Sequence, residues 1–401
     1  MSFLFMKISI FSYVYKPENF LINDLAESLA YSNQVEVLTG LPNYSKEGFY
    51  PGYNLLGPYN ETINRIRIVR YPLLARKSGL LRLVFNYFTS IVGSLLSIFR
   101  LKKSEVTFVF ATSPIFTAIP AIIFAKLRGG KVVIWLQDLW PESFFAITNR
   151  SPNSFLGRVL GSIVKWIYKN TDLMLIQSND FRINLEKYGY KGRIEWVPNW
   201  AKEDKAEDCP KWIDEIPNDK FVITFAGNIG VAQKLETLAD AVLELNDERI
   251  HLAVVGDGRE KERLENLYSD SNLIKFYGRK PAGDMPYLFE KADALAVILK
   301  KDPAFSLVVP SKVQSYLMAK KPIIASLDGA GANLINELQV GVISPSEDVD
   351  ELAKNIKRLI SISSEERFEM GERAFNAYAK YFKQEKVIKR IEELLQEVVN
   401  S

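Results

Sequence analysis

The feature that most constrains the fold is a regular alternation of short apolar segments with longer segments of helical character. In the first half of the chain the short segments are "KISIFS", "QVEVLTG", "IRIVRY", "EVTFVFAT", "KVVIWLQD" and "DLMLIQS". The pattern restarts with "FVITFAGNIG", "RIHLAVVGDG", "LIKFYGR", "ALAVILK" and "PIIASLDG". Apolar strands that alternate with helices indicate a parallel sheet covered on both faces. The sequence therefore predicts an α/β fold with two doubly wound, Rossmann-like domains and a cleft between them.

The chain length supports this division, because 401 residues are more than a domain with a single hydrophobic core usually contains. Between the two sets of strands lies "AKEDKAEDCPKWIDEIPND", a charged segment with two prolines that we interpret as the interdomain linker. We predict domains at 1–201 and 202–381, with the C-terminal helix at about 382–401 as a candidate to pack back on the first domain.

Composition excludes several classes of site. The single cysteine, Cys209, cannot form an internal disulfide, and the single histidine, His251, excludes any multi-histidine metal site. His251 also begins a strand, far from its carboxyl end, which favours a structural role. No Asp-x-Asp pair ends a strand, so we expect neither a metal nor another cofactor.

The charge is unevenly divided between the halves of the chain. Residues 1–201 contain 23 Lys and Arg against 13 Asp and Glu, whereas the remainder contains 28 against 35. A basic first half predicts an acidic partner such as anionic lipid or a pyrophosphate. No nucleic-acid-binding motif is present, so nucleic acid is not expected.

Residues 80–99, "LLRLVFNYFTSIVGSLLSIF", are long enough to suggest a membrane span, but Arg82 and Asn86 interrupt them. We expect a core helix or a helix that lies on the surface. Basic residues flank the segment, and they predict peripheral attachment of a cytoplasmic protein to an anionic inner leaflet. The alternative is a core helix whose basic ends are solvated. The residues concerned are Arg76, Lys77, Arg82, Arg100, Lys102 and Lys103.

Two strand-to-helix turns of the second half are candidates for binding an anion or a hydroxyl-rich ligand. The first is Ala226–Gly230, where glycines let backbone amides approach a diphosphate. The second is the helix start in "VVPSKVQSYLMAKKPII", with Pro310, Ser311, Lys312 and Gln314. The alternatives are a simple tight turn and a helix that Ser311 merely caps. Gly256 and Gly258 in "VVGDGRE" are interpreted as a turn.

Taken in order with "LTGLPNYSKEGFYPGY", "QDLWPESFF" and "VPNW", these turns resemble the retaining, nucleotide-sugar-dependent glycosyltransferases of family four, which have the GT-B fold. The similarity spans nearly the whole chain and looks closest to the bacterial N-acetyl-L-fucosamine transferases of O-antigen and capsule synthesis. The resemblance implies transfer of a sugar from a UDP-sugar to an acceptor linked to a polyprenyl diphosphate, without a metal.

The resemblance also implies roles for residues of the second half, with some departures. Ser306 and Gln314 stand where the family has two glutamates, the second of which binds the ribose hydroxyls. The family places an Arg and a Lys on the donor diphosphate, whereas this chain has Asn228 and Gln233, with Lys234 one position later. The donor-binding residues predicted in this way are Gly227, Asn228, Gly230, Lys234, Arg279, Pro310, Ser311, Lys312 and Gln314.

Three acidic residues of the first half are candidate catalytic groups. Asp138 and Glu142 follow a strand in "QDLWPESFF", where they are expected to hold the acceptor hydroxyl or stabilise a cationic sugar ring. The alternative is that Asp138 caps the turn and Glu142 is solvated in a first helical turn. Glu18 is expected to begin a helix after the first strand and to face the cleft.

Two other classes of protein fit the same architecture. Non-hydrolysing sugar-nucleotide 2-epimerases share it, but they need groups that remove and return a ring proton, and no histidine lies near a predicted cleft turn. A non-catalytic protein that binds a sugar nucleotide is the other alternative, and the replacement of the two family glutamates favours it.

Overall fold

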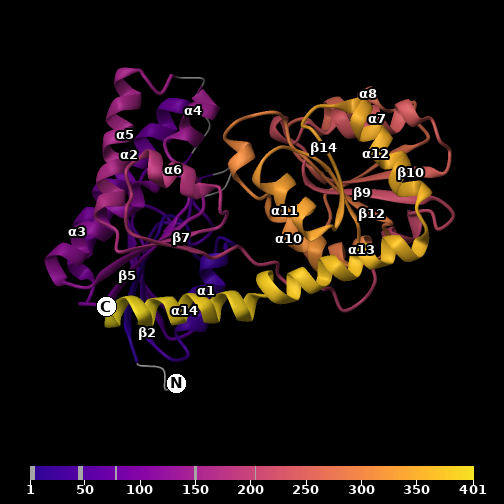
Figure 1. The fold of residues 1–401 in the computed structure, drawn as a ribbon. Coiled ribbons are helices and arrows are strands. Elements are labelled where there is room, and N and C mark those ends of the chain that lie inside the picture. Colours follow the sequence, from indigo (N-terminus) through magenta and orange to yellow (C-terminus); the bar gives the residue numbers. More distant parts are fainter. Residues whose placement is uncertain (1–4, 44–47, 77–78, 149–150, 204) are drawn as a thin grey trace. The chain divides into compact units, whose positions relative to one another are not determined.

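The computed structural model describes residues 5–43, 48–76, 79–148, 151–203 and 205–401. The chain forms two compact units (Figure 1). Unit 1 comprises Met1–Pro198 and Val387–Ser401, and unit 2 comprises Asn199–Lys386. The segment interpreted as a linker belongs to unit 2, and that interpretation is wrong for most of its length. Ile213 and Ile216 are buried, and the Trp212 indole donates a hydrogen bond to Asp284 (2.8 Å).

Unit 1 contains an eight-stranded sheet in the order β3-β4-β2-β1-β5-β6-β7-β8. All neighbouring strands pair in parallel except β3 and β4, which are antiparallel. The sequence predicted the parallel strands, but β3 and β8 are short and carry polar residues, so their apolar pattern is weak. The strands are β1 (Lys7–Ser12), β2 (Gln34–Gly40), β3 (Asn60–Ile63), β4 (Ile66–Tyr71), β5 (Val106–Ala111), β6 (Lys131–Leu136), β7 (Leu173–Ile176) and β8 (Arg193–Trp196).

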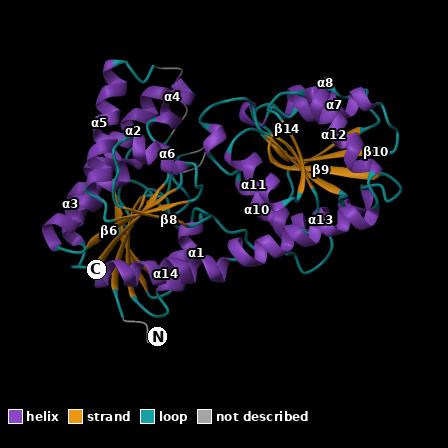
Figure 2. Cartoon of the chain, in the orientation of Figure 1, coloured by secondary structure: helices purple, strands orange, loops and turns teal. Residues whose placement is uncertain are grey.

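Helices cover both faces of this sheet (Figure 2). One face carries α1 (Leu21–Leu29) and the end of α14 (Gln384–Asn400). The other face carries α2 (Leu80–Ser97), α3 (Ala118–Arg128), α5 (Phe155–Lys169) and α6 (Phe181–Lys187), and α4 (Glu142–Thr148) precedes α5.

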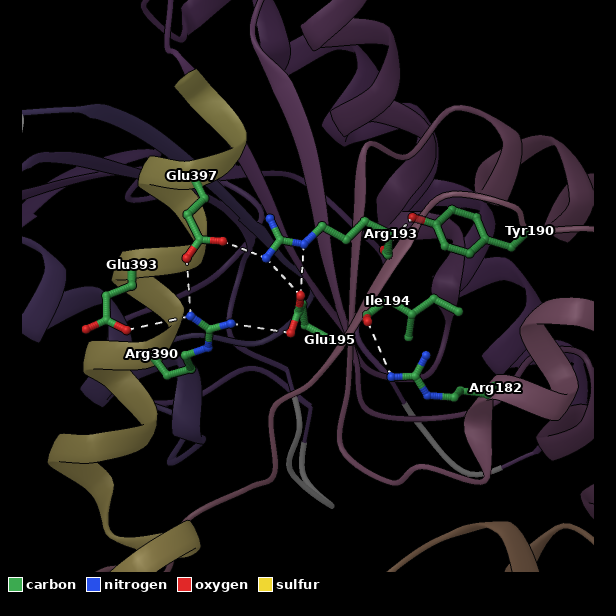
Figure 3. Close-up of polar contacts among 8 residues, drawn as sticks. All are labelled: Arg182, Tyr190, Arg193, Ile194, Glu195, Arg390, Glu393 and Glu397. Carbon is green, nitrogen blue, oxygen red and sulfur yellow. Dashed lines mark hydrogen bonds and ion pairs between the residues drawn. The ribbon is translucent and has the colours of Figure 1, made fainter. Parts of the chain in front are cut away.

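Ion pairs and hydrogen bonds attach the end of α14 to unit 1. Figure 3 shows Arg193 and Arg390 alternating with Glu195 and Glu397, with N–O distances between 2.6 and 3.4 Å. At the end of α1, Ser32 and Asn33 donate to Glu392 (2.6 and 2.8 Å). Since the apolar side of α14 is also buried, this helix is an integral part of unit 1.

Unit 2 contains a six-stranded parallel sheet in the order β11-β10-β9-β12-β13-β14. The strands are β9 (Phe221–Asn228), β10 (Ile250–Asp257), β11 (Ile274–Gly278), β12 (Ala294–Ile298), β13 (Ile323–Ser326) and β14 (Gly341–Ser344). One face carries α7 (Glu236–Leu245), α8 (Lys261–Leu267) and α12 (Val349–Ser361). The other carries α9 (Met285–Lys291), α10 (Ser311–Met318), α11 (Ala330–Leu338) and α13 (Ser364–Ala377). The predicted class, two doubly wound α/β units, is confirmed.

Candidate functional site

In unit 2 the strand order reverses between β9 and β12, the position where ligands bind in doubly wound sheets. Here Lys312, the second residue of α10, lies across the end of β9. A Cβ atom placed on Gly227 would lie 2.7 Å from Cε and 3.1 Å from Nζ of Lys312. Gly227 also has a φ of +132°, a backbone conformation that favours glycine, whereas the flexible Lys312 side chain could move away from an added Cβ atom.

The Lys312 ammonium is the most unusual polar group of this region. It is buried, it has no hydrogen-bond partner among the described residues, and it lies 3.6 Å from the centroid of the Phe225 ring. Burial lowers the pKa of Lys312 from 10.5 to about 7. An isolated ammonium in such surroundings is unfavourable unless an anion joins it. Lys312 is therefore a candidate for binding an anion, and its role in donor binding stays a prediction.

The glycine turn after β9 offers fewer backbone amides than the sequence predicts. The amide of Ile229 donates to the Asp257 carbonyl (2.9 Å), and the amide of Gly230 donates to Gln233 Oε1 (3.2 Å). The Asn228 side chain also donates to Gln233 (3.0 Å). With these groups engaged within the unit, Lys312 and the start of α10 are the stronger anion-binding groups.

Gly256 and Gly258, at the end of β10, have a packing role. A Cβ atom on Gly256 would lie 1.8 Å from the Gly227 carbonyl oxygen, and one on Gly258 would lie 2.1 Å from that of Ile229. The two strand ends therefore approach each other closely only because both residues are glycine. Gly256 lies within β10 and Gly258 directly follows Asp257, so the interpretation of Gly256 as a turn residue is wrong.

The start of α10 differs from the simple alternative of a serine cap. Its N-cap residue is Pro310, and no side chain caps the helix, so the alternative that Ser311 is the cap is wrong. Gln314 is only 1% exposed, and its amide, oriented to satisfy its neighbours, donates to the carbonyls of Pro310 (3.1 Å) and Ser311 (2.9 Å). Gln314 thus stabilises the first turn of α10, and its contact with a ribose stays a prediction.

The structure also places two other predicted donor-binding residues, Lys234 and Arg279, and the single histidine, His251. Lys234 follows the turn after β9 in a left-handed conformation (φ 43°) and is half-buried. Arg279 is exposed after β11, which is two strands from β9, or roughly 10 Å at normal strand spacing. The structure does not bring Arg279 together with Lys312. His251 is buried against the Tyr277 hydroxyl (3.0 Å), and burial lowers its pKa to about 4, as expected for a structural histidine.

In unit 1 the carboxylate of Asp138 organises the turn between β6 and α4. It accepts hydrogen bonds from the hydroxyls of Ser113 and Ser143 and from the amide of Leu139. The Trp140 indole in turn donates to Ser113 (2.8 Å). This pattern agrees with the structural alternative, and a catalytic role for Asp138 stays a prediction.

Glu142, the first residue of α4, differs from the alternative of a solvated residue, and its catalytic role stays a prediction. Its Oε1 forms an ion pair with Lys187 (2.7 Å) and accepts a hydrogen bond from the Tyr188 hydroxyl (3.1 Å), so it is not a solvated residue. Its Oε2 is buried and has no partner among the described residues. The sequence could not reveal Lys187 and Tyr188, because they lie more than 40 positions away at the end of α6.

Glu18 lies elsewhere than predicted. α1 begins at Leu21, so Glu18 does not begin a helix. Its side chain is 2% exposed, and its Oε1 accepts a hydrogen bond from the amide of Asn43 (2.9 Å). This contact joins the loops that follow β1 and β2. The expectation that Glu18 begins a helix is wrong, and its position at a cleft stays a prediction.

The helix α2 has its polar side inward and its apolar side outward. The buried residues on it include Asn86, Ser90, Ser94 and Ser97, and the exposed ones are Val84, Phe85, Phe88, Val92 and Leu96. Asn86 bonds the Tyr13 hydroxyl and the Leu74 carbonyl, which explains why it is buried. In the part of the chain that the structure describes, Arg82–Arg100 alone is long and apolar enough to cross a membrane by length and composition. Its polar side is buried within unit 1, and its apolar side lies on the surface of that unit.

The basic residues predicted to flank this helix do not form one group. Arg82, Lys102 and Lys103 are exposed. The Arg100 guanidinium donates to the carbonyls of Arg70 (3.1 Å) and Tyr59 (2.7 Å), so its predicted contact with lipid is replaced by a structural role. Arg76 is partly buried, and Lys77 lies outside the described residues.

Unit 2 matches a known family. Residues 210–377 match the family described as "Glycosyl transferases group 1". The match spans most of unit 2, so unit 2 is similar to the glycosyl transferases of group 1, in agreement with the sequence resemblance.

Similar proteins extend this match. The chain is 26% identical over 261 residues to "Probable glycosyltransferase WbjE" of Pseudomonas aeruginosa, covering 61% of this chain and 64% of that protein. The alignment thus spans just under two thirds of WbjE. It is 24% identical over 331 residues to WcaI of Escherichia coli K12, named for glycosyl transfer in colanic acid biosynthesis, covering 78% and 81%.

Solved structures identify the fold of the whole chain. The sucrose-phosphate synthase of Thermosynechococcus elongatus gives a TM-score of 0.74 at 14% identity, covering 98% of both chains. Anabaena HepE in complex with UDP gives 0.71 at 15% identity, covering 98% of this chain and all of HepE. These neighbours are GT-B glycosyltransferases, and the chain has the GT-B fold, as predicted.

Proposed function

We propose that this protein is a retaining glycosyltransferase that moves a sugar from a UDP-sugar to an acceptor carried by a polyprenyl diphosphate. The observation that carries the proposal is the buried ammonium of Lys312 beside Gly227, which has no hydrogen-bond partner among the described residues. It lies at the position where a doubly wound sheet binds its ligand. The group 1 match of unit 2 and the UDP in the HepE structure support a nucleotide-sugar donor.

The chemistry requires that the negative charge on the leaving diphosphate be stabilised. Lys312 and the amino end of α10 supply positive charge from the protein itself. No group of three or more His, Cys, Asp or Glu side chains suited to a metal occurs among the described residues. We therefore propose a metal-independent reaction without a cofactor, in which the leaving phosphate accepts the proton of the attacking hydroxyl. In this scheme Glu142 of unit 1 orients the acceptor through its unpaired Oε2.

The surface of unit 1 supports a proposal for the acceptor and for the location of the protein. We propose that the outward apolar side of α2 lies on the inner leaflet of the cell membrane, with Arg82, Lys102 and Lys103 near the lipid head groups. A polyprenyl-linked acceptor stays in that membrane. The name of WcaI supports a role in surface polysaccharide synthesis. N-acetyl-L-fucosamine, or a related N-acetylamino sugar, is the donor sugar that we propose from the sequence resemblance.

The test is incubation of the purified protein with a panel of radiolabelled UDP-sugars and a polyprenyl-diphosphate-linked saccharide. Label that moves to the lipid fraction, with retention of anomeric configuration, is the expected result. Label found in a 2-epimer of the UDP-sugar would instead identify an epimerase. UDP-sugar binding without any conversion would identify a non-catalytic binding protein. The Lys312→Met variant is the matched control, because it removes the ammonium and keeps an unbranched apolar stem as far as Cε.

A further inference from the structure

The helices α2, α3 and α5 form one layer over unit 1, and their composition is unusual. Together they contain six basic residues and no Asp or Glu. Large apolar side chains are exposed on each of the three helices. They are Val84, Phe85, Phe88, Val92 and Leu96 on α2, Leu127 on α3, and Phe155, Val159 and Trp166 on α5. An apolar surface with only basic charge is complementary to an anionic lipid surface.

This layer also contains an open groove between α3 and α5, with a volume of about 660 Å³. That volume is within the usual range for small-molecule sites. The groove is lined by Ile119, Ile123, Phe155, Arg158, Val159, Ser162, Ile163 and Trp166. Six of its eight lining residues are apolar, and the apolar Phe155 is 79% exposed. A shallow groove of this kind suits a flexible hydrocarbon chain, with Arg158 and Ser162 as its polar lining residues.

The direction of the groove relates it to the candidate acceptor groups. Ile119 and Phe155 lie in the first turns of α3 and α5. Since both helices follow strands of the parallel sheet, their amino ends lie toward the carboxyl edge of that sheet. Asp138 and Glu142 lie at this same edge, after β6. A chain in the groove can therefore place its head group toward them.

We propose that the groove between α3 and α5 binds the isoprenoid chain of the lipid-linked acceptor. Arg158, on the groove, provides the positive charge nearest to the head-group end, in the first turn of α5. The proposal rests on the proposed function for the identity of the lipid. It adds a binding site on unit 1 that is separate from the general contact of α2 with the membrane.

The test measures protein binding to three kinds of vesicle. The first is phosphatidylcholine alone, the second adds undecaprenyl phosphate, and the third adds phosphatidylglycerol at equal charge. We expect Phe155→Ser and Val159→Ser, two exposed groove positions, each to weaken binding to the second vesicle about tenfold and to leave binding to the third unchanged. The control, Phe88→Ser on the outer side of α2, should weaken binding to the second and third vesicles equally.

Two results would overturn the groove proposal. One is that the groove variants weaken binding to both charged vesicles equally, which would make the groove part of a general membrane contact. The other is that they weaken neither. UDP binding, measured by calorimetry on the same preparations, tests the proposed function separately. If the protein binds undecaprenyl phosphate through the groove but does not bind UDP, the groove proposal stands and the proposed transferase function is wrong.

Discussion

Replacing Lys312 by Met should stabilise the unliganded protein and weaken its binding of UDP. Methionine keeps an unbranched apolar stem as far as Cε, and it removes an ammonium that is buried without a hydrogen-bond partner among the described residues. The interval between a pKa of 10.5 and one of about 7 corresponds to roughly 5 kcal/mol, at about 1.4 kcal/mol per pKa unit. This figure is an upper bound on the cost of keeping Lys312 charged in the folded state.

The effect on stability depends on pH in a defined direction. Between pH 7 and 10.5 the unfolded chain keeps its proton on Lys312 and the folded chain loses it, so the free energy of unfolding rises with pH. Below pH 7 both states are protonated, and the whole cost of burying the charge remains. The difference in melting temperature between Lys312→Met and the unchanged protein should therefore be larger at pH 6 than at pH 9.

The charged form of Lys312 lowers the stability of the folded protein, but it should strengthen the binding of UDP. A diphosphate beside Lys312 raises its pKa again, so binding at pH 8 should take up close to one proton, and binding at pH 6 almost none from this group. Calorimetry in buffers of different ionisation enthalpy measures that uptake. Lys312→Met should abolish it and weaken UDP binding by roughly ten- to a hundred-fold, as expected for loss of a charge-assisted hydrogen bond.

Lys320→Met is the matched control, since Lys320 is exposed just beyond α10, where it pairs with Glu372 (3.0 Å) and lies 4.5 Å from the centroid of the Phe375 ring. It should change neither proton uptake nor UDP affinity. The reasoning is refuted if Lys312→Met binds UDP as tightly as the unchanged protein, or if that protein takes up no proton at pH 8.

Three further predictions concern the reaction and the role of unit 1. Transferase activity should survive treatment with EDTA, and a loss restored only by magnesium or manganese would contradict the proposed charge stabilisation. Glu142→Gln should lower turnover at least tenfold with a stability change under about 1 kcal/mol, because its partner Lys187 is largely exposed; normal turnover would remove Glu142 from the mechanism. Arg100→Ser should destabilise the protein by about 2 kcal/mol in urea titrations through its lost bonds to backbone carbonyls, whereas Lys102→Ser should change stability little; equal effects would contradict the structural role of Arg100.

The sequence predicted the sheets better than it predicted the site. Parallel strands such as β6 and β12 are buried on both faces, so their apolar runs are unambiguous. Strands with polar residues, such as β3 with its sequence NETI, have no such pattern. The burial of Gln314 and the environment of Glu142 depend on contacts that tertiary packing makes, and a single sequence does not record those partners.

Lys312 is the site residue that the structure supports most strongly. The sequence predicted it from its place at a helix start, whereas the structure supports it because its ammonium is buried. The sequence indicated a lysine near exposed amides, but the structure buries its ammonium against Phe225. Similarly, residues 80–99 were correctly interpreted as a helix of the unit, but apolarity alone could not show that Asn86 lies on the buried side. Hydrogen bonds between residues that are far apart in the sequence determine which side of such a helix is buried.

The attachment of α14 to unit 1 has a consequence for how the chain folds as it is made. Ribosomes release the amino-terminal segment first, and amino-terminal domains usually fold first during synthesis. Unit 2 is continuous from Asn199 to Lys386, so it can complete its fold as soon as that segment has emerged. Unit 1 lacks the partners of Arg193 and Glu195 until Arg390 and Glu397 have been made. The half of the protein that is synthesised first is therefore the half that is completed last.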